Sequence, residues 1–260
     1  MSLFSIVVLA IIQGVAEFLP ISSSGHVVIA SSLLELGNNL DIDDVNIVLH
    51  AGSLLSILVV YWRKIWELLN KDRRTIPVLL VATLPAVAIG LVIKKCFDHL
   101  LTNPSLAGAM LVVTGIMLLL AGRLRNGEQT YQELSFRRAL AIGFAQAVAV
   151  LPGISRSGAT ISSGLAMGLT RQDAATFSFL MAIPVIAGAS LLEIVSIMRD
   201  PVSITTSGTN LLVGAAISFV VGVVSLLALL RILERGRLQY FALWCIPAGV
   251  FVLGWQVLHV

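Results

Sequence analysis

The sequence predicts an all-α polytopic membrane protein with six transmembrane helices and two opposed re-entrant helical hairpins, related by an inverted-topology repeat. Three observations lead to this fold class. Of the 260 residues, 57% are hydrophobic and only 12% are charged, and the mean hydropathy is +0.97, values that exclude an ordinary soluble domain. Apolar stretches of near-spanning length recur along the chain, and two further apolar regions are broken by Pro, Gly and Ser. The broken regions also share a sequence repeat.

Six apolar stretches approach the roughly 20 residues that a membrane helix requires. They lie at 47–62, 76–93, 105–122, 174–198, 210–230 and 239–258. Two other regions, 3–34 and 139–168, contain ionisable residues and helix-breaking clusters, and they are typical of broken helices. No soluble domain remains, so we expect a single membrane domain over residues 1–260, built of two repeats, about 1–133 and 134–260.

The basic residues predict the topology. Thirteen of the seventeen Lys and Arg residues fall at Arg171 or in the connectors 63–74, 123–138 and 231–237. We assign these to the cytoplasm, because short cytoplasmic loops collect positive charge. The acidic connectors 36–46 and 199–209 then face outward, with Lys94 and Lys95 as a mild exception. This topology makes 3–34 a hairpin from the outer side and 139–168 a hairpin from the cytoplasmic side; one long kinked helix in each region is the alternative.

An ungapped repeat supports the hairpins. A shift of 133 residues superposes segment 13–25 on segment 146–158 with seven of thirteen positions identical. Polar residues are among the matches, which run Gln13/Gln146, Val15/Val148, Ala16/Ala149, Ile21/Ile154, Ser22/Ser155, Ser24/Ser157 and Gly25/Gly158. One hairpin and three spans in each half would insert the second half upside down, so that the hairpins meet at the midplane, where such repeats bind ligands.

Each broken region predicts a turn followed by a new helix start, with serines at the start. Phosphate binds readily at helix N-termini because free N–H groups and the positive end of the helix dipole converge there. Two opposed starts therefore suit a diphosphate. Arg156 adds a planar cation for phosphate, and at this depth it requires a partner. Glu17 or an anionic ligand can serve, and a purely structural Arg156–Glu17 pair is the alternative.

His26 follows Ser23 by three residues, within reach on one helical turn, and its imidazole is a natural proton carrier near neutral pH. Three chemistries stay open. Ser23 can attack phosphorus with His26 or Glu17 as base, His26 can attack directly, or water can be activated. His50 begins a later span and either lines the entrance to the site or caps a helix.

Segments 17–26 (EFLPISSSGH) and 152–160 (PGISRSGAT) closely resemble the two signature motifs of the undecaprenyl-pyrophosphate phosphatase family, also known for bacitracin resistance. The resemblance covers nearly the whole chain. It implies a hydrolase in the bacterial plasma membrane that removes the terminal phosphate of a polyprenyl pyrophosphate and recycles the carrier lipid for peptidoglycan synthesis. The family's site is thought to open to the outer side.

Carried over by motif position, the resemblance makes Glu17, Ser23, His26 and Arg156 the catalytic candidates. The expected substrate-binding set is Ser22, Ser24 and Gly25 with Ser155, Ser157, Gly158 and Thr160. The resemblance also implies a divalent cation, Mg²⁺ or Ca²⁺. The family often has a second acidic residue four positions before Glu17, where this chain has Gln13. We therefore expect a cation at Glu17 with Gln13 to be held partly by substrate phosphates; a structural role for Gln13, as for Gln146, is the alternative.

A different function class stays open. Inverted repeats with broken helices are typical of transporters, and the alternative function is to flip an anionic lipid or move a phosphorylated solute. A hydrolase requires reactive groups in the site, whereas a transporter requires only alternating exposure. Beyond the lipid substrate and the bilayer we expect no nucleic-acid partner, and a homodimer stays open.

Overall fold

The computed structural model describes residues 2–33, 39–199 and 207–259, and these are almost entirely helical. In chain order the α-helices are α1 (Leu3–Ala16), α2 (Ser23–Leu33), α3 (Asn39–Val60), α4 (Trp62–Asn70), α5 (Thr75–Cys96), α6 (Pro104–Ala121), α7 (Phe136–Val148), α8 (Arg156–Ala166), α9 (Arg171–Arg199), α10 (Gly208–Glu234) and α11 (Ala242–His259). Three short 3₁₀ turns, Asp98–Leu100, Tyr131–Glu133 and Leu238–Phe241, join some of them. The predicted all-α class is confirmed.

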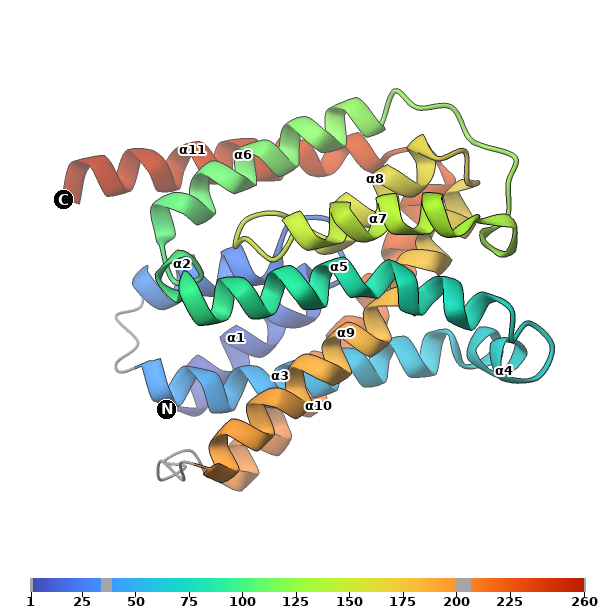
Figure 1. Ribbon diagram of the computed structural model, residues 1–260. Coiled ribbons are helices and arrows are strands. Elements are labelled where there is room, and N and C mark those ends of the chain that lie inside the picture. The colour runs from blue at the N-terminus through green and yellow to red at the C-terminus, as the bar shows by residue number, and fades with distance from the viewer. Residues whose placement is uncertain (1, 34–38, 200–206, 260) are drawn as a thin grey trace.

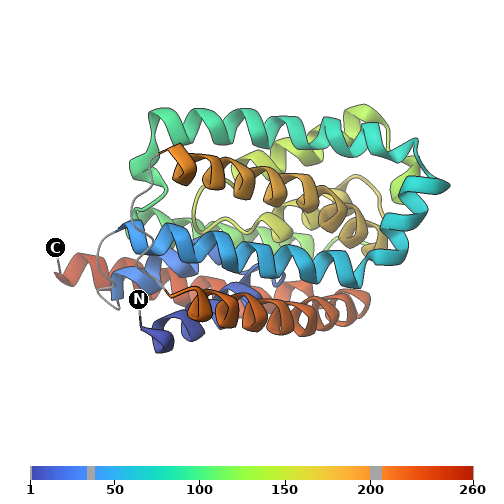
Figure 2. The ribbon, with the colours of Figure 1, turned by 90° about the horizontal axis from the view of Figure 1, so that it is seen from below.

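The long apolar helices make this a multi-pass membrane protein. Five helices in the described residues, α5, α6, α9, α10 and α11, are long and apolar enough to cross a membrane. Helices α3 and α4 form a bent apolar pair, with 70° between them, which brings the number to six if the pair is one span. All six predicted spans are therefore helical, and most long helices run in the same general direction (Figures 1 and 2).

Two connectors differ from expectation. Helix α3 begins at Asn39, so much of the predicted outer connector 36–46 is helical, and the predicted connector 63–74 contains α4. Helix α4 resembles an amphipathic interfacial helix, because its Trp62 and Trp66 side chains are exposed. Residues 36–38 and 200–206 of the predicted outer connectors lie outside the described residues.

The basic connectors lie at one end of the molecule, as the charge pattern predicts. Figure 1 shows α4, the α6–α7 connector and the start of α11 at the right-hand end. Contacts tie them together: the backbone N–H of Arg171 donates to Asn126 Oδ1 at 2.8 Å, and the Arg171 guanidinium lies beside Gly236. The segregation of positive charge to one end is thus a property of the folded chain.

Both interrupted regions fold as two short helices joined by a turn. We call α1–α2 the first unit and α7–α8 the second unit. Proline and a positive φ break each of them: Ser22 has φ +70° after Pro20, and Gly153 has φ +93° after Pro152. In Figure 1 the first unit opens toward the end that carries both termini, and the second unit opens toward the end that carries α4. Their turns meet in the interior.

Small residues seat the units in the bundle. Helix α1 packs against α10 and α7 packs against α5. A Cβ atom on Gly143 of α7 would lie 2.3 Å from the carbonyl oxygen of Ala82, and one on Gly14 of α1 would lie 2.9 Å from that of Ser218. Glycine thus permits the close helix approach that is common in membrane bundles. These close approaches hold α1 against α10 and α7 against α5.

Candidate active site

The turns of the two units touch through Ser22 and Gly153. The backbone N–H of Gly153 donates to Ser22 Oγ at 3.1 Å, and the same oxygen accepts from the N–H of Gly25 at 3.3 Å. The contact leaves no room for a larger residue, since a Cβ on Gly25 would lie 2.8 Å from Gly153. The predicted meeting of the two motifs is therefore confirmed at atomic contact.

Helices α2 and α8 begin in the same way. Ser22 Oγ caps α2 through Gly25, and Ser155 Oγ accepts from the N–H of Gly158 at 3.1 Å as the cap of α8. These pairs are related by the 133-residue shift. The first N–H groups of each helix have no carbonyl partner within the helix. Two helix N-termini, both suited to anions, thus lie side by side.

A cavity of about 310 Å³ adjoins both helix starts. The polar part of its lining comprises Glu17, Ser22, Ser23, Ser24, His50, Gln146, Ser155 and Arg156. The apolar part comprises Ala16, Ala86, Ala149, Val150, Ile154, Val185, Ile186 and Ala189. Ala189, on α9, is exposed, so the apolar part reaches the surface of the bundle.

Glu17 is the centre of the polar part of the lining. Its side chain is only 8% exposed. Oε1 pairs with Arg156 Nη2 at 2.5 Å, and Oε2 accepts from Ser23 Oγ at 2.7 Å and from Gln13 Nε2 at 3.1 Å. The predicted ion pair between the units exists, and a serine hydroxyl is hydrogen-bonded to the same carboxylate. This is the geometry of a nucleophile beside a base.

Further polar contacts hold the second unit. Thr114 Oγ1, on α6, donates to the carbonyl of Gly153 at 2.8 Å and accepts from the N–H of Ser155 at 3.1 Å. Ser157 Oγ lies 3.2 Å from Ser155 Oγ, and Thr160 Oγ1 lies 2.6 Å from Ser178 Oγ. Of the residues predicted to bind substrate, Ser22, Ser24 and Ser155 line the cavity, whereas Gly25, Ser157, Gly158 and Thr160 stand behind it.

The structure does not bring His26 to the cavity. Its Nδ1 donates to the carbonyl of Ser22 at 2.8 Å, and its Nε2 accepts from Trp244 Nε1 of α11 at 2.9 Å. Because a tryptophan N–H can only donate and a carbonyl can only accept, both ring nitrogens are occupied in the neutral imidazole. Among the described residues, the imidazole that lines the cavity is that of His50, whose Nδ1 bonds the carbonyl of Asn46 at 2.8 Å.

Comparison with known proteins agrees with this architecture. Residues 6–251 match the family described as bacitracin resistance protein BacA. The chain belongs to this family. It is 54% identical to the undecaprenyl-diphosphatase of Rhodopirellula baltica over 252 residues, covering 96% of this chain and 97% of the relative. It is 36% identical to the undecaprenyl-diphosphatase of Halothermothrix orenii over 256 residues, covering 97% of this chain and 98% of the relative.

A protein-held metal ion does not fit this BacA-family site. Among the described residues no group of three or more His, Cys, Asp or Glu side chains could hold a metal, and Glu17 is the only carboxylate on the cavity wall. Both Glu17 oxygens are already bonded, and Gln13 turns its N–H donor toward Glu17. Hard cations prefer several oxygen ligands, so we derive no catalytic step through a metal bound to the protein.

Two cavity residues were not predicted as site residues. His50 was placed at the entrance or at a helix cap, and the imidazole lies on the cavity wall. Gln146 was recognised only as the repeat partner of Gln13, yet it lines the cavity and is 2% exposed. The signal in the sequence that could have identified Gln146 is that the repeat has glutamine at both equivalent positions, 13 and 146.

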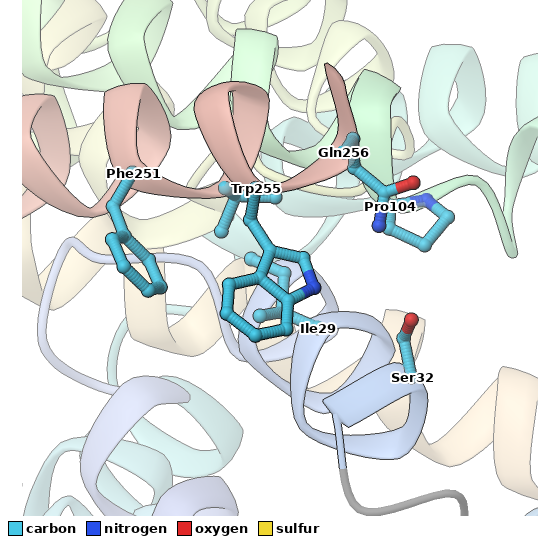
Figure 3. Close-up of a pocket in the computed structure, with 7 residues that line it drawn as sticks. Ile29, Ser32, Pro104, Phe251, Trp255 and Gln256 are labelled. Carbon is cyan, nitrogen blue, oxygen red and sulfur yellow. The ribbon is translucent and has the colours of Figure 1, made fainter. Parts of the chain in front are cut away.

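A second hollow lies on the surface between α2, the start of α6 and α11. Figure 3 shows Phe251 and Trp255 of α11 facing Ile29 and Ser32 of α2, with Pro104 beside them. Its volume of about 10 Å³ has room for about one water molecule. It offers no space for a substrate.

Proposed function

We propose that this chain is an undecaprenyl-diphosphatase: it hydrolyses undecaprenyl diphosphate to undecaprenyl phosphate and inorganic phosphate, recycles the carrier lipid for cell-wall synthesis, and thereby confers bacitracin resistance. One observation carries the proposal, namely a cavity lined by Glu17, Ser23 and Arg156 together with apolar side chains, inside a bundle of helices long and apolar enough to span a membrane. The names of the relatives agree with this function.

The combination of polar and apolar lining residues suits an amphipathic substrate. The diphosphate would lie at the starts of α2 and α8, where N–H groups, serine hydroxyls and Arg156 converge. The first isoprene units would lie against Val185, Ile186 and the exposed Ala189 of α9 and extend from there into the bilayer. A water-soluble diphosphate would leave this apolar part of the lining unused.

The hydrogen bond between Ser23 and Glu17 supports a nucleophilic role for Ser23. In the first step, Ser23 Oγ attacks the terminal phosphorus while its proton passes to Glu17 Oε2, the bridging P–O bond breaks, and the leaving prenyl monophosphate takes that proton from Glu17. In the second step, water, deprotonated by Glu17, attacks the phosphoserine, and the P–O bond to Ser23 breaks, with the proton returned to Ser23 Oγ and inorganic phosphate released. Direct attack by water, with Glu17 as base, would use the same groups.

Arg156 would contact both Glu17 and the substrate phosphate. Nη2 fixes the orientation of Glu17, and Nη1, which is buried without a hydrogen-bond partner among the residues described, is available for a phosphate oxygen. Charge-assisted hydrogen bonds of this kind stabilise developing negative charge in a water-poor site. The Mg²⁺ or Ca²⁺ implied by the family resemblance would be held by the diphosphate oxygens.

We also infer that the two units are re-entrant hairpins of an inverted repeat, with the cavity opening to the outer side. The equivalent caps at Ser22 and Ser155 support it, as does the exchange of partners between the halves. Under the 133-residue shift α1 corresponds to α7 and α5 to α10, and the structure pairs α1 with α10 and α7 with α5. The exposed Ala189 lies in the half of α9 away from the basic connectors.

Phosphate release from a C55 prenyl diphosphate by the purified protein in detergent tests the function. We expect release by the wild type with Mg²⁺ or Ca²⁺ present, and a loss of about 10²-fold or more for Ser23→Ala. Ser163→Ala is the matched control, because Ser163 Oγ bonds only carbonyls of its own helix. A folded wild-type protein that releases no phosphate with any cation would favour lipid transport instead.

A further inference from the structure

Gln146 is a buried amide that the fold does not satisfy. Its side chain lies on α7 and is 2% exposed, and neither Nε2 nor Oε1 has a hydrogen-bond partner among the described residues. Buried amides are nearly always paired, because an unpaired donor or acceptor has lost its solvation without compensation. A glutamine in this condition requires a binding partner that is not part of the chain.

The repeat supplies an internal comparison. Gln13 occupies the equivalent position of the first unit and is equally buried, at 1% exposed. Its Nε2 donates to Glu17 Oε2 at 3.1 Å. The position equivalent to Glu17 in the second unit is Val150, which offers no acceptor. The same residue on the same scaffold is therefore a structural hydrogen-bond donor in one unit and an unpaired donor in the other.

The unpaired amide lies on the wall of the cavity. Gln146 and Arg156 both line it, and Arg156 Nη1 is a second buried donor without a partner in the part of the chain that the structure describes. Two unpaired donors in the lining of one cavity, next to the N-terminus of α8, suit an anion with several oxygens. We propose that Gln146 is a substrate-binding residue that donates from Nε2 to a phosphate oxygen beside Arg156.

This inference rests on the proposed diphosphate hydrolysis and adds a binding residue to it. The donor of Gln146 pairs with a phosphate oxygen, and Oε1 can accept from a protonated phosphate oxygen or from water. An amide adds no charge, so its hydrogen bond contributes to phosphate binding rather than to stabilising charge that develops in the reaction. Its loss is expected to appear chiefly in KM.

The test combines stability with kinetics. Gln146→Met keeps the length of the side chain and removes both polar atoms. Removing an unpaired buried amide leaves the ligand-free unfolding midpoint unchanged or raises it, whereas Gln13→Met, the matched variant in the first unit, lowers it by removing a made hydrogen bond. Inorganic phosphate raises the midpoint of the wild type, and this shift is lost in Gln146→Met. For a C55 prenyl diphosphate, KM rises about tenfold or more.

Two results would each overturn the inference. A ligand-free midpoint that falls in Gln146→Met as it does in Gln13→Met would make Gln146 a structural residue. A phosphate shift and KM of wild-type size would show that the amide does not contact the anion. The test of Gln146 is separable from the test of the proposed function. If the wild type hydrolyses the lipid and Gln146→Met does so equally well, only the role of Gln146 is rejected. A wild type without hydrolysis still allows the phosphate-shift comparison.

Discussion

The turn of the first unit contains Ser22 at φ +70°, and the turn of the second contains Gly153 at φ +93°. Both turns end in a serine cap, at Ser22 and at Ser155, yet their side chains differ in charge. The first unit contributes Glu17 and Ser23, where the second has Val150 and Arg156. Two equivalent positions of the sequence repeat thus contribute a carboxylate and a hydroxyl from the first unit, and a cation from the second, to one cavity.

The two turns are also anchored differently. A non-glycine residue at positive φ is strained by about 1–2 kcal/mol, and the Ser22 turn is held by His26, which is in turn bonded to Trp244 of α11. The Gly153 turn carries no such strain and is held by Thr114 of α6. We infer that the first turn depends on its anchor for activity and that the second depends on its anchor chiefly for stability.

The largest expected effect is that of Arg156→Ala. It removes the cation of the second unit, and we expect kcat/KM for a C55 prenyl diphosphate to fall by about 10³-fold, the scale of losing a preorganised charge in a desolvated site. Steady-state phosphate release measures it. Arg156→Lys keeps the charge but not the two-pronged geometry, so recovery of full activity in that variant would show that charge alone is enough.

An intermediate effect is expected at the first anchor. His26→Ala removes the donor to the Ser22 carbonyl, and kcat should fall about tenfold, as expected for loss of one positioning hydrogen bond. His26→Asn retains an N–H donor but cannot carry a proton, and it should recover to within about threefold of the wild type. If both variants are equally inactive, His26 carries a proton in the reaction.

Trp244 provides a check on the same anchor. Trp244→Phe should lower kcat by about the same factor as His26→Ala, and combining the two changes should add little, because both break one chain of contacts. Trp66→Phe at the exposed surface of α4 is the matched control. Additive losses in the double variant would mean that Trp244 does not act through His26.

The smallest effect on activity is expected at the second anchor. Thr114→Val removes the two hydrogen bonds to Gly153 and Ser155, and we expect unfolding free energy to fall by about 1–3 kcal/mol. Activity per folded molecule should change less than in His26→Ala. Thermal unfolding in detergent together with kcat measures both quantities, and a loss of activity larger than that of His26→Ala would reverse the comparison.

Much of this architecture follows from the sequence for physical reasons. The six spans could be predicted because lipid requires long apolar segments with satisfied backbones. The interrupted segments and the convergence of Glu17 and Arg156 could be predicted from Pro, Gly and the repeat. The bend between α3 and α4 was missed, since no proline or glycine marks it.

The position of His26 could not be predicted from local spacing. Three residues separate it from Ser23, which allows one face of a helix, but the orientation of the ring is set by Trp244, 218 residues further along the chain. The pairing of Gln13, by contrast, is local: Glu17 follows it by four residues, and Val150 follows Gln146 by the same spacing without offering a side-chain acceptor.

The central claim is that one active site is formed jointly by the two units, and a double-mutant cycle between Glu17 and Arg156 tests it most directly. The measurement is kcat/KM for Glu17→Gln, Arg156→Gln and the double variant, with a C55 prenyl diphosphate in detergent. The two residues act as a unit across the contact. The kcat/KM of the double variant should therefore be only slightly lower than that of the less active single variant, with a coupling free energy of about 2 kcal/mol or more. Losses that simply add would contradict a shared site.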